Sequence, residues 1–392
     1  MKESIKAKGS RWLLAYSRGF NKFLPSPFAI ALLLTAVAGF SALFITDTEE
    51  VLRAWSDGLW NPSLLRFGFQ AMFMLVLGHV LALSAPVKYF LDKVVILAVR
   101  NTALAPAYVA FFALMLGWLN WGLGLVAGAL LAKSVIDKSE KHGYGIRPGL
   151  LGAAGYMGLL VWHSGLSGSA PLKVAESGHL LSLYPKGADW QLPIPDSISI
   201  SSTVFSTWNI SITIGVILVV VLLFAVLGHL FNQQTQEPQT LTPQSSLTDD
   251  DIGGDHVKDY SISEKLDNAR GLAWVFGVLF LGTAIWLTIS SESAATRLGF
   301  VTPDWINLIL LGLALLAHGS IKNLLSALEK AIGGASGILL QFPIYFGIMG
   351  LVTGTGLVTI LSGALVSSTN ITTLPLAIFT SSGVLNIFVP SG

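Results

Sequence analysis

The stretch from Ala103 to Ala132 constrains the fold more than any other part of the chain, because it is almost wholly apolar and has basic residues at both ends. These basic residues are Lys88, Lys93 and Arg100 before it, and Lys133, Lys138, Lys141 and Arg147 after it. An excess of lysine and arginine marks the cytoplasmic side of a membrane. Two full spans need roughly 40 residues, and this stretch has about 30. The sequence therefore predicts a re-entrant hairpin over about residues 103–137 that turns at residues 119–124.

The composition is that of a polytopic membrane protein. Hydrophobic residues make up 53% of the 392 residues and charged residues 11%, and the mean hydropathy is +0.68. A net charge of +1 without a basic, aromatic-interleaved patch argues against a nucleic-acid partner. The absence of cysteine excludes disulfides, zinc-thiolate sites and cysteine nucleophiles.

The histidines and carboxylates show no spacing typical of a metal site, a catalytic triad or a paired acid and base. We therefore expect no metal, no cofactor and no enzymatic activity. A membrane-embedded enzyme or an assembly factor is the remote alternative.

The first apolar run, Phe28 to Ile45, follows a basic N-terminus and is longer than the apolar region of a usual signal peptide. It is predicted to be an uncleaved first span with the N-terminus in the cytoplasm; a cleaved secretion signal is the alternative. Phe67 to Ala85 then returns the chain to the cytoplasm, and the hairpin follows.

Gly149 to Trp162 is apolar but too short to span, since it covers about 20 Å of a roughly 30 Å hydrocarbon core. It runs into residues 163–171, His-Ser-Gly-Leu-Ser-Gly-Ser-Ala-Pro, which do not continue a helix comfortably. A broken helix is therefore predicted over about residues 149–183. After an external loop, Trp208 to Phe231 crosses inward and completes a first membrane half, residues 1–231.

Residues 232–270 are rich in Gln, Pro, Ser, Thr and Asp and are predicted to form a polar cytoplasmic linker. The second membrane half is residues 271–392. Its predicted spans are Gly271 to Ser290 outward, Trp305 to Ala317 inward and Ala331 to Val352 outward, and a second hairpin begins near Leu374.

Equivalent parts of the two halves run in opposite directions. Gln70 lies on an inward span and Gln341 on an outward one, and each precedes a Leu-Asn pair, at 119–120 and 385–386. Opposed directions of this kind are typical of inverted-repeat carriers. The chain stops at residues 389–392 within an apolar segment, so we expect the second half to be truncated within its re-entrant hairpin.

Asn120 and Gly122 are the first candidates for a binding site. An unpaired amide amid apolar residues costs free energy and is able to bind an ion or a substrate instead, although a hydrogen bond between helices is the simpler alternative. The neighbouring glycine allows backbone groups to point into a polar site. Asn386 with Ser391 is the matching candidate in the second hairpin.

Ser167, Gly168 and Ser169 are the second group of candidates, because a loop of hydroxyls and free amides beside a helix terminus suits a carboxylate. An ordinary glycine-rich turn is the alternative, and no Gly-Lys-Ser/Thr closes a phosphate-binding loop. Lys173 either neutralises the anion or snorkels to the interface. Residues that line a polar cavity or take part in ion coupling are expected among Gln70, Gln341 and His163, with helix-helix hydrogen bonds as their alternative role.

Five segments also carry a family resemblance. They are Ser-Ala-Pro-Val-Lys at 84–88, Leu-Asn-Trp-Gly-Leu-Gly-Leu at 119–125, Ser-Gly-Ser-Ala-Pro-Leu at 167–172, Gln-Phe-Pro-Ile-Tyr at 341–345 and Asn-Ile-Phe-Val-Pro-Ser-Gly at 386–392. In this order and over nearly the whole chain, they resemble the bacterial short-chain fatty acid transporter family. That family normally continues past the final Ser-Gly with another pair of spans.

The resemblance implies uptake of small monocarboxylates such as butyrate or acetoacetate across the bacterial inner membrane. It also implies an all-α fold with inverted repeats, two opposed re-entrant helical hairpins and broken helices, an elevator-type motion and, as in many such carriers, a homodimer. Na⁺-coupled relatives in the wider superfamily carry Ser-Asn-Thr at the hairpin tips, which this chain lacks, so the coupling ion, H⁺ or Na⁺, stays open. A carrier for dicarboxylates or another small organic anion is the alternative function.

Overall fold

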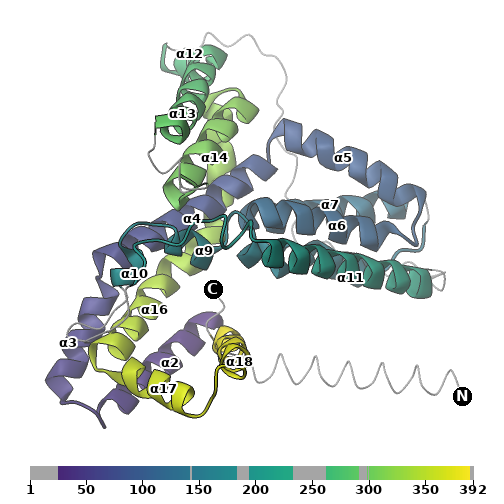
Figure 1. The fold of residues 1–392 in the computed structure, drawn as a ribbon. Coiled ribbons are helices and arrows are strands. Elements are labelled where there is room, and N and C mark those ends of the chain that lie inside the picture. The colour runs from purple at the N-terminus through teal and green to yellow at the C-terminus, as the bar shows by residue number, and fades with distance from the viewer. Residues whose placement is uncertain are drawn as a thin grey trace, which may run out of the picture. The chain divides into compact units, whose positions relative to one another are not determined.

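The computed structural model describes residues 25–141, 144–182, 194–232, 262–290, 298 and 300–388 (Figure 1). Within these ranges the secondary structure is helical, and there is no strand. The predicted all-α class of membrane protein is therefore confirmed. The inverted repeats and the depth of the hairpins in a membrane stay predictions.

Most of the described residues lie in helices. The helices before residue 200 are α2 Pro27–Ala42, α3 Thr48–Leu59, α4 Pro62–Ala82, α5 Ala85–Arg100, α6 Ala105–Leu119, α7 Trp121–Lys141, α8 Pro148–Tyr156, the 3-10 helices η1 Met157–Leu160 and η2 Trp162–Ser164, α9 Ser169–Val174 and α10 His179–Ser182. The helices after residue 200 are α11 Thr207–Asn232, α12 Ile262–Asp267, α13 Arg270–Ser290, α14 Pro303–His318, α15 Ile321–Ile332, η4 Gly333–Ala335, α16 Ser336–Gly354, α17 Leu357–Ser367 and α18 Leu374–Phe388.

Four helical stretches in the described ranges are long and apolar enough to cross a membrane: Thr48–Ala82, Thr207–Phe231, Arg270–Ser290 and Ile321–Gly354. Large apolar side chains such as Trp208 and Leu222 on α11, and Val275 and Ile285 on α13, are exposed on their surfaces. A soluble protein rarely exposes so many, whereas a lipid environment accommodates them without cost.

The chain divides into two compact units. Among the described residues, the first contains those up to Gly68 and from Gly337 onward, and the second contains those from Phe69 to Ser336. In the first unit, α3 and α16 approach closely, since a Cβ added at Gly58 would lie 2.4 Å from the carbonyl oxygen of Phe346. The stacked rings of Phe67 and Phe342, 6.2 Å apart, join the start of α4 to α16.

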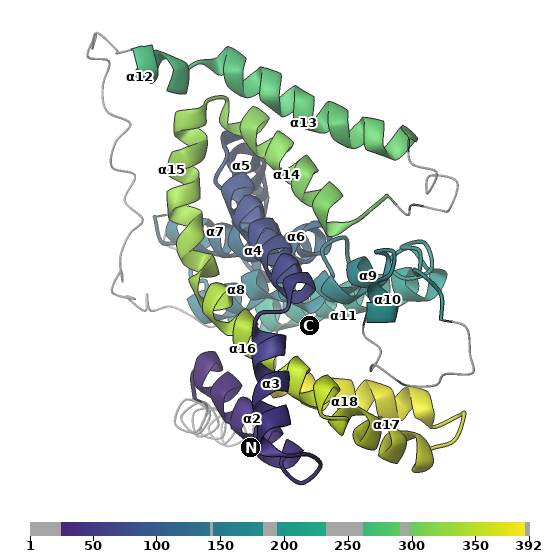
Figure 2. The same cartoon turned by 90° about the vertical axis from the view of Figure 1, so that its left-hand side faces the viewer.

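The second unit is built around the hairpin of α6 and α7, with α5, α8 and α11 packed on it (Figures 1 and 2). The 15 residues of α6 rise about 22 Å, less than a roughly 30 Å hydrocarbon core. The apolar part of α7 ends at Lys133, so each arm is shorter than a full span. The chain turns between the two helices at the single residue Asn120.

Glycines bring α8 and the hairpin into contact. A Cβ added at Gly155 on α8 would lie 2.5 Å from the carbonyl oxygen of Gly128 on α7. In the same way, a Cβ at Gly124 would lie 2.3 Å from the Cα of Gly117. The two hairpin arms are therefore in backbone contact beside their turn. Because backbone meets backbone at these points, no larger residue fits without a shift.

A second apolar cluster gathers around α4 and α14. It includes Met74 and Leu77 on α4, Ile306 and Leu310 on α14, and Leu172 on α9. The outer face of α14 is covered by α13, and α15 follows after a left-handed turn at Gly319 (Figure 2). This cluster also contacts Trp118 and Trp121, which flank the hairpin turn.

The observed segments differ from the predicted ones in three places. The helix predicted over Gly149 to Trp162 is α-helical only to Tyr156 and continues as short 3-10 helices. Two amphipathic helices, α3 and α15, lie where no span was predicted. Of the predicted linker 232–270, residues 233–261 lie outside the described residues, as do residues 389–392 of the second hairpin.

The contact between α7 and α8 gives a stability prediction. Gly155→Ala should lower the melting temperature of the detergent-solubilised protein, because overpacking at such a contact costs about 1–3 kcal/mol. Gly152→Ala on the same helix is the control: a Cβ there has nothing within 4 Å, and alanine should gain up to about 1 kcal/mol of helix propensity. Equal melting temperatures for the two variants would contradict the contact.

Candidate functional site

Asn120 forms the turn of the hairpin and caps α7. Its backbone is extended, with φ −154° and ψ 125°, and its Oδ1 accepts a hydrogen bond of 2.8 Å from the backbone N–H of Leu123. Its own N–H donates to the carbonyl of Leu116, and its carbonyl accepts from the N–H of Gly124. Asparagine is a favoured N-cap because its side-chain oxygen satisfies an N–H of the first turn in this way.

The side-chain amide nitrogen of Asn120 is left without a hydrogen-bond partner among the described residues, although the residue is only 2% exposed. Its identity as nitrogen follows from chemistry, because the atom facing the Leu123 N–H has to be the oxygen. The indole N–H of Trp118 is a second buried donor without a partner in the described part of the chain. The hairpin turn therefore presents two unsatisfied N–H groups two residues apart.

The Ser/Gly loop lies directly against this turn. The N–H of Leu166 donates to the carbonyl of Trp118 at 2.9 Å, and the N–H of Trp121 donates to Oγ of Ser167 at 2.8 Å. Ser167 is buried, and in this contact its hydroxyl oxygen only accepts, so its O–H remains able to donate. Hydrogen bonds to the backbone of Trp118 and of Trp121, on either side of Asn120, thus join the loop to the hairpin turn.

Gly168 and Ser169 follow in the same loop. A Cβ added at Gly168 would lie 2.4 Å from the carbonyl oxygen of His163, so the loop folds back on itself there. Ser169 is buried at the first position of α9. The carbonyl and hydroxyl of Ser164 accept hydrogen bonds from Asn209 and Thr213 on α11, at 2.9 and 3.0 Å, which fix the beginning of the loop.

Aromatic rings surround the turn. The Trp121 and Trp162 rings lie 5.4 Å apart, and His163 lies against Trp162 with ring centroids 3.7 Å apart and ring planes tilted by 38°. Trp118 meets Phe205 edge-on at 6.1 Å. These rings are mostly half-buried, and they give the polar turn an apolar surround.

Helix α4 crosses the hairpin turn at two glycine contacts. A Cβ added at Gly78 on α4 would lie 2.1 Å from Oδ1 of Asn120, and one added at Gly122 would lie 2.6 Å from the carbonyl oxygen of Leu75. The position of the Asn120 side chain therefore depends on the absence of a side chain at residue 78. Gly122 serves this close approach and is not itself shown to bind a ligand.

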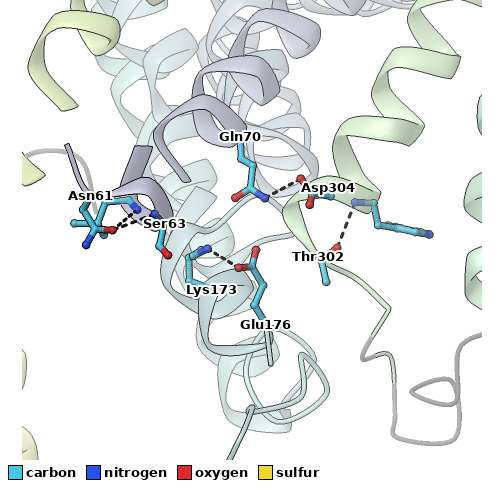
Figure 3. Close-up of polar contacts among 9 residues, drawn as sticks. Asn61, Ser63, Gln70, Lys173, Glu176, Thr302 and Asp304 are labelled. Atoms are coloured by element: carbon cyan, nitrogen blue, oxygen red, sulfur yellow. Dashed lines mark hydrogen bonds and ion pairs between the residues drawn. The ribbon is translucent and has the colours of Figure 1, made fainter. Parts of the chain in front are cut away.

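A second polar group lies between α4 and α14 (Figure 3). The side-chain N–H of Gln70 donates to Oδ1 of Asp304 at 2.7 Å, and the side-chain N–H of Asn307 donates to the backbone carbonyl of Gln70 at 3.0 Å. Further along, His318 contacts the carbonyl of Val80 at 2.8 Å. The two helices therefore run parallel, which is the relative direction of these spans in the predicted topology.

Lys173 and Glu176 form an ion pair at 2.5 Å, and both side chains are largely buried (Figure 3). Lys173 is thus held by a carboxylate of this chain. Burial lowers the pKa of the nearby His179, the positive charge of Lys173 lowers it further, and Glu176 opposes this with a smaller upward effect.

The structure brings together Asn120, Gly122, His163 and residues 167–169 among the residues predicted from sequence. Gln70 lies on α4 but nearer its N-terminus than the residues that contact the turn, and Gln341 lies on α16 in the other unit. The side chain of Asn386 and the whole of Ser391 lie outside the described residues. No group of three or more His, Asp or Glu residues able to hold a metal occurs in the described ranges.

Three residues were missed from sequence: Trp118, Asp304 and Asn307. Asn307 is an amide within a predicted span and would have been found by the criterion that selected Gln70. Asp304 immediately precedes the predicted span that starts at Trp305, so a search for polar residues within the spans does not select it. Trp118 carried no signal that separates it from the other aromatic residues of the hairpin.

Comparison with known proteins gives consistent results. A family model described as "Short chain fatty acid transporter" matches residues 11–392. A protein of Escherichia coli strain K12 named "Putative short-chain fatty acid transporter" is 32% identical over 383 residues, which are 96% of this chain and 80% of that protein. A protein of Haemophilus influenzae strain Rd with the same name is 32% identical over 379 residues, 95% of this chain and 79% of that protein. No solved structure matches significantly.

The N-cap role of Asn120 and the carboxylate-binding role predicted for it are separable by mutation. Asn120→Ser keeps a good N-cap for α7 but removes the amide donor, whereas Asn120→Ala removes both. We expect the alanine variant to lose about 1 kcal/mol of stability and the serine variant to lose less of it, while both lose carboxylate binding. Melting temperature and butyrate binding, measured on both variants, check this. Wild-type binding in the serine variant would exclude the amide nitrogen as a ligand.

Proposed function

This chain belongs to the short-chain fatty acid transporter family, and we propose that it is a secondary carrier that takes up short-chain fatty acid anions such as butyrate or acetoacetate across the inner membrane. We further propose that uptake is coupled to H⁺ or Na⁺. The carboxylate of the substrate would bind at the turn of the α6–α7 hairpin.

The observation that carries this proposal is the pair of unpartnered N–H donors, on Asn120 and Trp118, at the turn. A buried donor without an acceptor is unfavourable by about 1–3 kcal/mol, so an incoming carboxylate relieves a cost already present in the empty protein. Ser167 adds a hydroxyl donor beside them. A carboxylate has about four lone-pair sites, so it is able to accept hydrogen bonds from all three donors without an accompanying cation.

The expected affinity suits a carrier. Hydrogen bonds to a charged group each contribute about 1.5–3 kcal/mol, so two of them supply roughly 3–6 kcal/mol. A millimolar dissociation constant corresponds to about 4 kcal/mol. Binding of this strength holds the substrate during a crossing and still allows release on the other side.

The surroundings favour a monocarboxylate with a short apolar tail. The rings of Trp118, Trp121 and Trp162 offer apolar surface next to the donors. A second carboxylate would need a further cation or donor group, and residues 103–137 contain no arginine. Lys173, the nearest lysine along the loop, already pairs with Glu176. A dicarboxylate therefore finds less support at this turn.

Other members of the site have supporting roles in this proposal. Ser167, Gly168 and Ser169 would form one wall of the site, and His163 lies against the Trp162 ring. Asn386, Ser391 and Gln341 remain proposed site residues of the other unit. An elevator-type motion and a homodimer remain part of the proposal by family resemblance.

The test is uptake of labelled butyrate into proteoliposomes that contain the purified protein, with Na⁺ and pH gradients imposed separately. We expect saturable uptake that is driven by one of the two gradients and is competed by acetoacetate more strongly than by succinate. Ser167→Ala should raise the half-saturating butyrate concentration roughly tenfold or more, since a hydrogen bond to a charged group is lost.

The control for that variant is Ser202→Ala, at an exposed serine of the loop before α11. It should leave uptake unchanged. Stronger competition by succinate would favour the dicarboxylate alternative, and an absence of uptake with correctly inserted protein would remove the proposal.

A further inference from the structure

Asn209, in the first turn of α11, holds two separate segments of the chain with one side-chain amide. Its Nδ2 donates a hydrogen bond of 2.9 Å to the backbone carbonyl of Ser164 and one of 2.8 Å to the backbone carbonyl of Val204. Carbonyls only accept hydrogen bonds, so the atom that faces both of them has to be the nitrogen, and each of its protons has a partner. The backbone N–H of Asn209 donates to Oγ of Ser206 at 3.3 Å, which fixes the residue at the start of the helix.

In each segment, the carbonyl that accepts from this amide immediately precedes a residue in contact with Trp118. Ser164 is followed by Gly165, where a Cβ would overlap the backbone carbonyl oxygen of Trp118. Val204 is followed by Phe205, whose ring meets the Trp118 ring edge-on at 6.1 Å, with the ring planes at 79°. A single side chain therefore holds the segment against the backbone of Trp118 and the segment against its ring.

Both segments are closed by further hydrogen bonds. The N–H of Phe205 donates to the carbonyl of Ile200 at 3.0 Å, and the N–H of Leu166 donates to the carbonyl of Trp118 at 2.9 Å. Ile200 is fully buried in the apolar cluster around α4 and α14. Because the segments are tied in this way, a displacement at either acceptor carbonyl is passed on to Trp118 and is not absorbed within the loop.

The other polar contact from α11 reaches only one of the two segments. Thr213, one turn further along the helix, donates to the hydroxyl of Ser164 at 3.0 Å. The double contact of Asn209 is therefore the one described hydrogen-bonded link from α11 that the two segments share.

The orientation of Trp118 matters because its indole N–H is one of the two unpartnered donors at the hairpin turn. Hydrogen bonds weaken steeply when the donor turns away from its acceptor. A small rotation of the Trp118 ring therefore changes the strength of any hydrogen bond that its N–H donates.

We infer that Asn209 is a positioning residue of the carboxylate site: it contacts no substrate and sets the orientation in which the indole N–H of Trp118 binds the carboxylate. The effect on affinity rests on the proposed function, whereas the effect on Trp118 does not need a substrate. The competing explanation is that Asn209 only ties the loops to α11. Its loss would then lower stability and leave the butyrate affinity of the folded protein unchanged.

The first measurement is made without butyrate, on purified protein that contains isotope-labelled tryptophan. The indole N–H signal of Trp118 in the NMR spectrum is identified by its absence in Trp118→Phe. Asn209→Leu has a side chain of similar size that donates to neither carbonyl, and we expect it to move this signal. Asn323→Leu is the matched control, because it removes an amide of the same unit that also donates to a backbone carbonyl, that of His318 at 3.2 Å. It should leave the Trp118 signal unchanged.

The second measurement is butyrate uptake into proteoliposomes, normalised to folded protein. Asn209→Leu should raise the half-saturating butyrate concentration roughly tenfold or more and keep the maximal rate close to that of the wild type, because a hydrogen bond to a charged group is weakened. Asn323→Leu should match the wild type in both. In a Trp118→Phe background, Asn209→Leu should cause little further loss, since two changes that act through one group are not additive.

A second variant covers the case in which Asn209→Leu does not fold. Asn209→Asp also donates to neither carbonyl, and its negative charge is favourable in the first turn of α11. The same changes in the Trp118 signal and in the half-saturating concentration are expected from it.

An unmoved Trp118 signal in the folded Asn209 variant overturns the inference. A moved signal with wild-type butyrate affinity, or additive losses in the double variant, overturns it as well. Failure of the wild type to take up butyrate would instead reject the proposed function, and the NMR comparison would still decide whether Asn209 positions Trp118.

Discussion

A break in a helix that is surrounded by apolar groups leaves backbone N–H and carbonyl groups that water cannot reach, and the fold has to supply partners for them. At the α6–α7 turn the partners come from Leu116, Gly124, Ser167 and the side chain of Asn120 itself. These backbone groups are thus satisfied without a ligand. Among the side chains of the turn, the amide nitrogen of Asn120 and the indole nitrogen of Trp118 have no partner in the described part of the chain.

The unsatisfied groups of the second unit are sorted by chemical type. The two at the hairpin turn are donors, which suit an anion, and the two between α4 and α14 are acceptors. Ser139, near the end of α7, carries the one remaining unsatisfied side-chain atom in the described part of this unit, and its hydroxyl belongs to neither group.

The sequence predicted the hairpin because two independent signals agreed there: basic residues at both ends and an apolar length too short for two spans. Asn120 and the Ser/Gly loop were found because polar residues in apolar surroundings are rare enough to be conspicuous. The contact between Trp121 and Ser167 was not predictable, since it joins residues 46 positions apart in the chain. Asp304 was missed for a different reason. A carboxylate at the end of a span is common, and only its contact with Gln70, 234 positions away, distinguishes it.

Helix α4 contacts both polar groups, and this has a mechanical consequence. Gln70 meets Asp304 and Asn307, while Gly78, about 12 Å further along the same helix, lies against the side chain of Asn120. Gly78 and the Asn120 side chain are in such close contact that even a methyl group at residue 78 would overlap Asn120. The two therefore cannot move closer together. A shift of α4 relative to α14 would therefore move the surface against which the Asn120 side chain rests. Helix α4 is thus the shortest physical connection between the two polar groups, and it needs no direct contact between them.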